Sequence, residues 1–196
     1  TGVIAYNATG STLSYDGTSA ITTADAEFPA SGGPANLVIN NSGGVTLHAS
    51  RSLPVSGVLT LTIGRFTLGA NDFTVNNTAA AAIASSSFSA STMIVAEGAG
   101  RLIRGVVINT SYTWPIGDVT GVADYSPVQM SLSANSGARL IGFNVVDANH
   151  PNLGAQTNFL SRYWTSSNSA GGTYTYTASF TYVPADVNGT ESLIQL

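Results

Sequence analysis

The chain has no cysteine, no lysine and few charged residues of any kind. The absence of cysteine excludes disulfide bonds and thiolate metal sites. The absence of lysine excludes isopeptide crosslinks between lysine and asparagine. Charged residues make up 8% of the chain, compared with about 25% in an ordinary globular protein. Hydrophobic residues make up 43%, which is enough to build a packed core and argues against a disordered chain.

The charge balance excludes several classes of partner. The net charge is −4, and only six residues are basic, all of them arginines. Nucleic-acid binding and docking on an acidic membrane surface both need clustered basic side chains. No stretch reaches the roughly 18–20 apolar residues of a membrane-spanning helix. We therefore expect no nucleic-acid partner and no membrane span.

Helix signals are almost absent, and strand and turn signals dominate. The only helix candidate is residues 78–87, which contain four consecutive alanines but no charged pairs one turn apart. A single helical turn and plain coil are equal alternatives there. The rest of the sequence predicts an all-β fold.

The sequence repeats itself loosely from Leu37 onward. Apolar–polar–apolar triplets are separated by glycine, asparagine and serine corners, and Leu47 matches Leu68 at a spacing of 21 residues. Leu53-Pro54-Val55 then falls near the position of Phe73-Thr74-Val75 one repeat later. In each triplet the outer residues are expected to face a core and the middle residue to face solvent.

Such a repeat is typical of the rungs of a β-solenoid. A run of β-hairpins is the alternative, because the Gly-Gly and Asn-Asn turns allow it as well. We favour solenoid-like stacking and assign residues 1–104 to this Thr/Asn/Gly-rich repeat region.

The character of the sequence changes after Gly105. Longer and more aromatic strands follow, with prolines at their margins, and this pattern predicts an antiparallel β-sandwich over residues 105–196. The join between the two regions is the segment 112–127, Y-T-W-P-I-G-D-V-T-G-V-A-D-Y-S-P.

Several segments, taken in order, resemble a known class of repeat module. They are 27–47 (E-F-P-A-S-G-G-P-A-N-L-V-I-N-N-S-G-G-V-T-L), 57–75 (G-V-L-T-L-T-I-G-R-F-T-L-G-A-N-D-F-T-V), 93–104 (M-I-V-A-E-G-A-G-R-L-I-R), 112–118 (Y-T-W-P-I-G-D), 125–128 (Y-S-P-V), 146–152, 160–165 and 185–192. Together they cover nearly the whole chain, and they resemble the modules of large secreted surface proteins of the Bacteroidota. The resemblance implies a non-enzymatic module of an exported, multi-domain surface protein that uses the type IX secretion route. It carries over no catalytic residue.

Two loops hold oxygen ligands at spacings that calcium accepts. Asp186, Asn188 and Glu191 surround a turn glycine, and Asp118 with Asp124 form a second candidate group. Calcium prefers roughly six to eight oxygen ligands, and an EF-type loop needs a longer acidic ladder than either loop provides. Plain turns are the favoured interpretation. We therefore predict no cofactor and keep calcium as the one candidate.

Nothing in the sequence indicates an active site. His48 and His150 are far apart and in no metal-binding spacing. His48 is expected to point outward, because its neighbour Leu47 points inward. The serines lie in no G-x-S-x-G motif, and no pair of the ten acidic residues stands out as a glycosidase pair. We predict that the protein is not an enzyme.

Aromatic side chains are the best candidates for binding a ligand. Within 173–183, one strand face carries Tyr174, Tyr176, Ala178, Phe180 and Tyr182. We expect this face to be core; the alternative is a flat surface that stacks sugar rings. The glycine-rich loop is flanked by two further tyrosines that are expected at the surface. The four ligand candidates are Tyr112, Tyr125, Tyr174 and Tyr176.

These observations favour a non-catalytic structural or adhesive module, secreted or displayed on the cell surface. It would serve as a spacer or as a self-assembling filament or surface-layer unit. The alternative is a carbohydrate-binding module that uses exposed tyrosine and tryptophan side chains. The expected partners are neighbouring domains, surface glycans, or copies of the same protein that pair through the N-terminal strand or a strand at 191–196.

Overall fold

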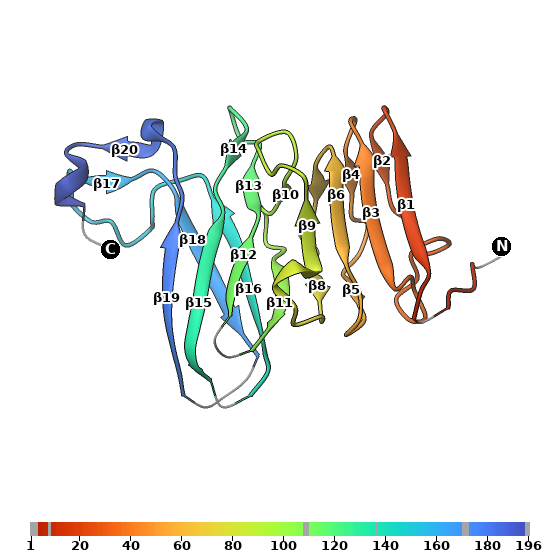
Figure 1. The fold of residues 1–196 in the computed structure, drawn as a ribbon. Helices are drawn as coiled ribbons and strands as arrows, with labels where there is room; N and C mark the ends of the chain where they lie inside the picture. The colour runs from red at the N-terminus through yellow and green to blue at the C-terminus, as the bar shows by residue number, and fades with distance from the viewer. Residues whose placement is uncertain (1–3, 8, 108–109, 136, 170–172, 195–196) are drawn as a thin grey trace.

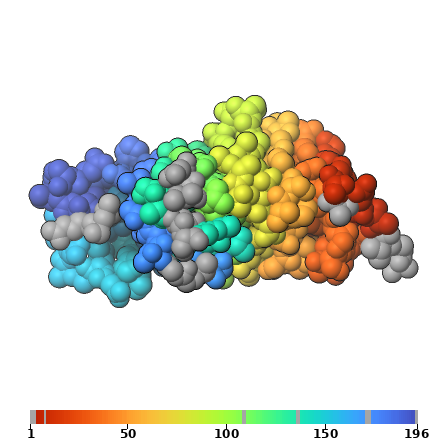
Figure 2. Space-filling model, turned by 60° about the horizontal axis from the view of Figure 1, so that its bottom comes forward, coloured from red at the N-terminus to blue at the C-terminus, as the bar shows by residue number. Residues whose placement is uncertain are grey.

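A computed structural model of the chain describes residues 4–7, 9–107, 110–135, 137–169 and 173–194. These residues form strands, turns and coil, with only three one-turn 3-10 helices among them, so the all-β class is confirmed. The helices are η1 (Ala80–Ala82), η2 (Pro184–Asp186) and η3 (Glu191–Leu193). Figures 1 and 2 show an elongated body along which the chain progresses from one end to the other.

Parallel strands from successive turns of the chain form three sheets. The first sheet has the order β1 (Thr12–Gly17), β3 (Asn36–Asn41), β6 (Leu59–Ile63) and β9 (Ile83–Ser85). The second has β2 (Ile21–Thr22), β4 (Val45–Thr46), β7 (Phe66–Thr67), β10 (Ile94–Val95) and β13 (Ile116–Asp118), with antiparallel β14 (Asp124–Tyr125) at its edge. The third begins with β5 (Arg51–Leu53), β8 (Phe73–Val75) and β11 (Leu102–Val106). This is the predicted solenoid-like stacking.

The strand register agrees with the repeat seen in the sequence. Leu37 lies opposite Leu59, 22 residues further along, and Val45 lies opposite Phe66, 21 residues further along. The predicted alignment of the next triplet is wrong by two residues, because Leu53 lies opposite Val75. As a result, Val55 falls outside β5 and is 78% exposed.

Alternation along the short strands builds the interior. In β3, Leu37 and Ile39 are fully buried and Val38 between them is half-buried, as side chains on opposite faces of a strand should be. Burial of each such aliphatic side chain contributes roughly 1.5–3 kcal/mol. Phe66 at the start of β7 and Phe73 at the start of β8 meet edge to face, with ring centres 5.0 Å apart. One hydrophobic cluster runs from the first rung to the C-terminal strands.

The corners between strands are held by neutral hydrogen bonds. The Nδ2 of Asn71 donates to the carbonyl of Leu47 at 3.0 Å, one rung away. Asn41 and Asn76 make the same kind of bond to their neighbouring rungs. Gly64 has a φ of +87°, and a side chain there would collide with the Asn41 carbonyl. Hydrogen bonds of this kind replace the ion pairs that the sequence can rarely supply.

The alanine-rich stretch 78–87 forms only a short helical turn. It contains η1 and then continues directly into β9, which pairs in parallel with β6. Of the two predicted alternatives for this stretch, the single turn of helix is therefore confirmed.

The strands after the solenoid are antiparallel, but they do not form a separate body. β16 (Arg139–Val146) pairs with β11, and β18 (Tyr163–Asn168) pairs with β16, so both extend the third solenoid sheet. A sandwich distinct from the solenoid is not confirmed, since β11 itself includes residues on both sides of the expected boundary at 104/105. The remaining strands form a three-stranded sheet of β12 (Ser111–Trp114), β15 (Val128–Asn135) and β19 (Tyr174–Phe180), and a small pair of β17 (Phe159–Leu160) and β20 (Val187–Asn188).

The segment 112–127 links these parts. Its first residues form β12 in the three-stranded sheet, and after Pro115 it becomes β13 and then β14 in the solenoid. Trp114, at the end of β12, packs edge to face on Phe143 of β16 at 5.0 Å. Its Nε1 donates to the carbonyl of Ile141 at 3.1 Å. The segment therefore contributes strands to two sheets.

Candidate functional site

A buried ion-pair cluster lies where the C-terminal strands meet the solenoid. Its centre is Arg162, just before β18, whose side chain has no exposed surface. Four aspartates from four different segments surround the guanidinium, and we call this group the Arg162 cluster. They are Asp118 at the end of β13, Asp124 in β14, Asp147 after β16 and Asp186 at the end of η2.

The guanidinium uses all three nitrogens in this cluster. Nη1 donates to Asp118 Oδ2 at 2.5 Å, and Nη2 donates to Asp124 Oδ2 at 2.9 Å. Nε lies 2.9 Å from Asp186 Oδ2, but it makes no hydrogen bond in this geometry. Asp147 Oδ1 is 3.7 Å from Nη2 and contributes charge only. Arg162 therefore ties together elements that are far apart in the sequence.

Local structure brings the first two aspartates together. β13 and β14 pair antiparallel, with Asp118 opposite Asp124. Gly117 allows the two backbones to approach, because a Cβ at this position would collide with the Asp124 carbonyl and the Met93 sulfur. Next along the chain, buried Ser126 accepts a hydrogen bond from Arg162.

The cluster holds more negative than positive charge in a buried place. Burial raises the pKa of Asp118 to about 6; Arg162 acts to lower it, while Asp147 and Asp124 raise it further. Asp118 Oδ1 is buried and has no hydrogen-bond partner among the described residues. Burial acts to lower the pKa of Arg162, but the surrounding aspartates outweigh it and raise that pKa. Asp118 therefore takes up a proton at a higher pH than an ordinary aspartate does.

The five residues predicted as calcium ligands all have protein partners in this structure. Asp118, Asp124 and Asp186 were placed in two candidate groups, yet all three face the same guanidinium. Asn188 donates its side-chain amide to the Asp186 carbonyl at 3.3 Å, and exposed Glu191 accepts a hydrogen bond from the Tyr182 hydroxyl. No group of three His, Cys, Asp or Glu side chains within the described ranges could hold a metal ion. The Arg162 guanidinium supplies the positive charge that faces three of these residues.

Two of the four tyrosine candidates are unsuited to an external ligand. Tyr112 is 1% exposed, and its hydroxyl accepts from the Val107 amide and donates to the Thr78 carbonyl. Its predicted surface position is wrong, because Tyr112 lies with Trp114 on the buried face of β12. Tyr125 is half-buried and stacks on Phe88 at 6.4 Å, and burial raises its pKa to about 12.

The other two candidates lie on β19, an edge strand. Tyr174 and Tyr176 stack on each other at 5.4 Å, and the Arg139 guanidinium lies 4.1 Å from the Tyr174 ring centre. Tyr176 is 50% exposed. The expectation that this whole face is core is wrong, because Tyr176 and Phe180 are exposed, while Tyr174 packs against the core. Tyr176 alone of the four has a largely open ring.

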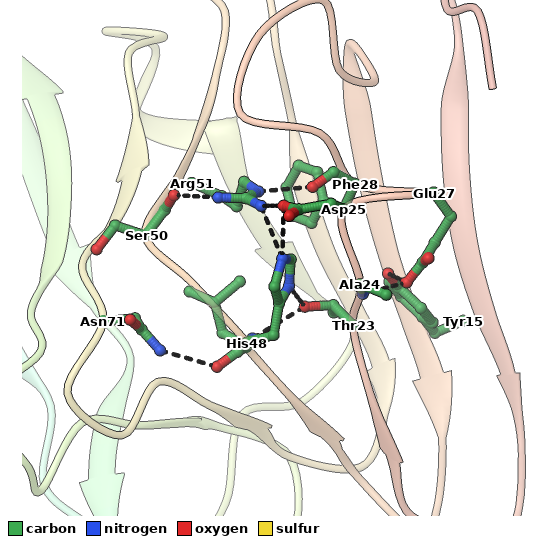
Figure 3. Close-up of polar contacts among 11 residues, drawn as sticks. Tyr15, Thr23, Ala24, Asp25, Glu27, Phe28, His48, Ser50, Arg51 and Asn71 are labelled. Atoms are coloured by element: carbon green, nitrogen blue, oxygen red, sulfur yellow. Dashed lines mark hydrogen bonds and ion pairs between the residues drawn. The ribbon is translucent and has the colours of Figure 1, made fainter. Parts of the chain in front are cut away.

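A second polar network lies in the first two rungs (Figure 3). His48 Nδ1 is 2.6 Å from the Thr23 hydroxyl, and its Nε2 is 2.9 Å from Asp25 Oδ1. Arg51 also pairs with Asp25, and its Nε donates to the Phe28 carbonyl at 2.6 Å. The hydrogen bond from His48 lowers the pKa of Asp25 below its usual value. The predicted outward position of His48 is found only in part, because its side chain is 20% exposed and its ring contacts the previous rung.

This network contains a hydroxyl, an imidazole and a carboxylate, but it is not built as a nucleophile. Thr23 is 2% exposed, so its hydroxyl cannot reach a substrate. The end of the network that faces solvent is Asp25, whose side chain is 81% exposed. The arrangement is therefore a brace between two rungs.

Sequence reasoning missed Arg162, Asp147, Thr23 and Asp25 as members of polar clusters. The network around His48, which we call the rung brace, could have been found by extending the repeat one rung upstream. Ile21 lies opposite Val45, 24 residues further along, and this register brings the residues after Ile21 next to those after Val45. For the Arg162 cluster there was no such signal, since its members come from unrelated segments.

A comparison of the chain with known protein families, curated proteins and solved structures found no match. No helix in the described part of the chain is long and apolar enough to cross a membrane.

Proposed function

We propose that the chain is a non-catalytic structural module of a secreted or surface-displayed protein, and that it acts as a spacer. The observation that carries this proposal is the arrangement of the rungs. Residues 4–7 lie at one end of the stack and residues 191–194 at the other, so the chain spans the long axis of the body (Figure 1). A module of this form separates whatever is joined to its two ends.

The polar side chains support the same role. The Arg162 cluster and the Thr23–His48–Asp25 brace each use their charged and polar groups to join segments of the fold. Neither group presents a nucleophile or a free acid–base pair on an open surface. A charge fraction of 8% leaves a neutral Thr/Ser/Asn-rich exterior, which suits a protein exposed to a changing ionic environment.

Assembly with copies of itself is a second candidate function. β1 is the edge strand of the first sheet, so its outer backbone groups have no strand partner in the described chain. Edge strands of this kind pair readily with other strands. The other predicted pairing segment, 191–196, is unsuited, because its described part contains η3.

The test combines solution scattering, mass measurement and a substrate screen. The isolated chain should scatter as an elongated particle and should hydrolyse no glycoside, ester or peptide substrate. A mass that rises with concentration would support assembly, and a Pro substitution at Ser14 in β1 should reverse that rise. A compact particle, or turnover of any substrate, would contradict the spacer role.

A further inference from the structure

A cavity of about 330 Å³ lies at the end of the body that is farthest from β1. The loop after β16 forms one wall, the start of β18 forms another, and Ile194 closes one side. Small-molecule sites in proteins are concave, mostly apolar and about 300–1,000 Å³ in volume. The cavity is at the lower end of this range, which suits one or two sugar-sized rings.

Aromatic rings form a corner in this cavity. The rings of His150 and Tyr163 are 4.9 Å apart and nearly perpendicular, at 79°. Trp164 continues the lining and is held by two contacts: its Nε1 donates to the Ser126 carbonyl at 3.1 Å, and its ring lies 5.1 Å from that of Phe180. These contacts fix the apolar surface before any ligand arrives, which reduces the entropic cost of binding.

Two side-chain amides face the same cavity without an assigned role. Asn152 and Gln156 line it, and neither amide side chain makes a hydrogen bond within the described chain. Each amide offers two donors and one acceptor. They are suited to a ligand that carries several hydroxyl groups.

The charges of the lining select against ionic ligands. Arg162 is the one charged side chain that lines the cavity among the described residues, and none of its four aspartates does. Its guanidinium is already engaged by Asp118 and Asp124, so it is not free to bind a phosphate or a carboxylate. A cation would meet the same positive group. The ligand that fits is neutral.

We infer that this cavity binds a neutral pyranose sugar, as a free saccharide end or a terminal residue of a glycan. The apolar C–H face of the ring would lie against His150 and Tyr163, and its hydroxyls would bond to Asn152 and Gln156. The site uses none of the four tyrosines proposed from the sequence. Sugar binding would add an adhesive activity to the structural module. The spacer role does not depend on it.

The test is binding of methyl pyranosides of glucose, galactose, mannose and N-acetylglucosamine, followed by a glycan array. Tryptophan fluorescence is a direct readout, because Trp164 lines the cavity and a ligand there would change its emission. The other tryptophan, Trp114, is fully buried in the core and serves as a constant background. We expect saturable binding to at least one sugar and a loss of at least tenfold in affinity in the double variant Asn152→Ala, Gln156→Ala. Asn149→Ala and Thr157→Ala, on the same loop but outside the cavity lining, should bind as the wild type does.

Choline and inorganic phosphate serve as charged probes and should not compete with the sugar. Binding of either in place of the sugars, no saturation with any sugar, or wild-type affinity in the double variant would each overturn the inference. The melting temperature of every variant shows whether a loss of binding reflects unfolding. Scattering of the wild type tests the spacer role separately.

Discussion

Arg162 and Asp118 form an ion pair at 2.5 Å in which neither side chain has any exposed surface. The two residues are 44 positions apart: Asp118 ends β13 of the second sheet, and Arg162 lies just before β18 of the third. The pair therefore ties the antiparallel strands to the solenoid. The boundary suggested by the sequence, at 104/105, lies elsewhere, within β11.

Replacing Arg162 by methionine should destabilise the fold strongly. The substitution keeps apolar bulk but leaves buried aspartates without their cation, a change that costs about 3–5 kcal/mol. Urea unfolding at pH 7 measures this loss. Arg65→Met is the matched control: Arg65 is half-buried and donates to the Ala90 carbonyl, and its loss should cost about 1 kcal/mol. Equal effects of the two substitutions would refute a special role for Arg162.

Asp118 should make the fold more stable as the pH falls below neutral. Its pKa in the fold is about 6, above its ordinary value of 3.8, so the folded state takes up a proton that the unfolded state does not. This contribution is fully present below pH 3.8 and is lost as the pH rises through 6. The free energy of unfolding of Asp118→Asn, taken relative to that of the wild type, should therefore increase by about 2–3 kcal/mol as the pH rises from 4 to 7. A difference that does not change with pH would show that Asp118 titrates normally.

The pKa of Asp25 should depend on His48. The hydrogen bond from His48 is the main cause that holds this pKa below its usual value. In His48→Ala the pKa of Asp25, followed by NMR titration, should rise toward the ordinary value. His150→Ala, at the other end of the molecule, should leave it unchanged. An unchanged Asp25 pKa in the first variant would mean that the rung brace does not form in solution.

Gly117→Ala should disturb the Arg162 cluster through the backbone. The added Cβ would collide with the Asp124 carbonyl, and overpacking of this kind costs about 1–3 kcal/mol. Gly10→Ala is the control, because no atom lies within 4 Å of a Cβ placed there. Thermal melting of the two variants separates a packing effect from a general effect of removing glycine. Similar melting temperatures would argue against close approach of β13 and β14.

The solenoid could be predicted from the sequence because each strand pairs with the strand one repeat further along, so the pairing follows from short, regular spacings. Alternation in segments such as 37–39 determines which side chains face inward, and glycine corners set the length of each turn. The same rule was less informative for His48, which lies beyond β4 and has a side chain that is 20% exposed. It failed for β19, because alternation shows that a strand has two faces but not whether another layer covers them.

The Arg162 cluster could not be predicted in this way. Asp118, Asp147 and Asp186 meet only after β16 and β18 have added to the third sheet, and nothing local in the sequence encodes that pairing. The acidic loops were recognised individually, but the cation that joins them was not. A lone arginine next to aromatic residues gives no signal until the fold brings its partners to it.

The distance between the two ends of the body tests the spacer role most directly. The chain has no cysteine, so a double variant Thr18→Cys, Ser192→Cys can be spin-labelled at these two exposed positions alone. Double electron–electron resonance should give one narrow distance distribution at the separation seen in the structure, because a continuous stack holds its ends apart. A broad distribution, or one centred at a much shorter distance, would contradict a rigid spacer.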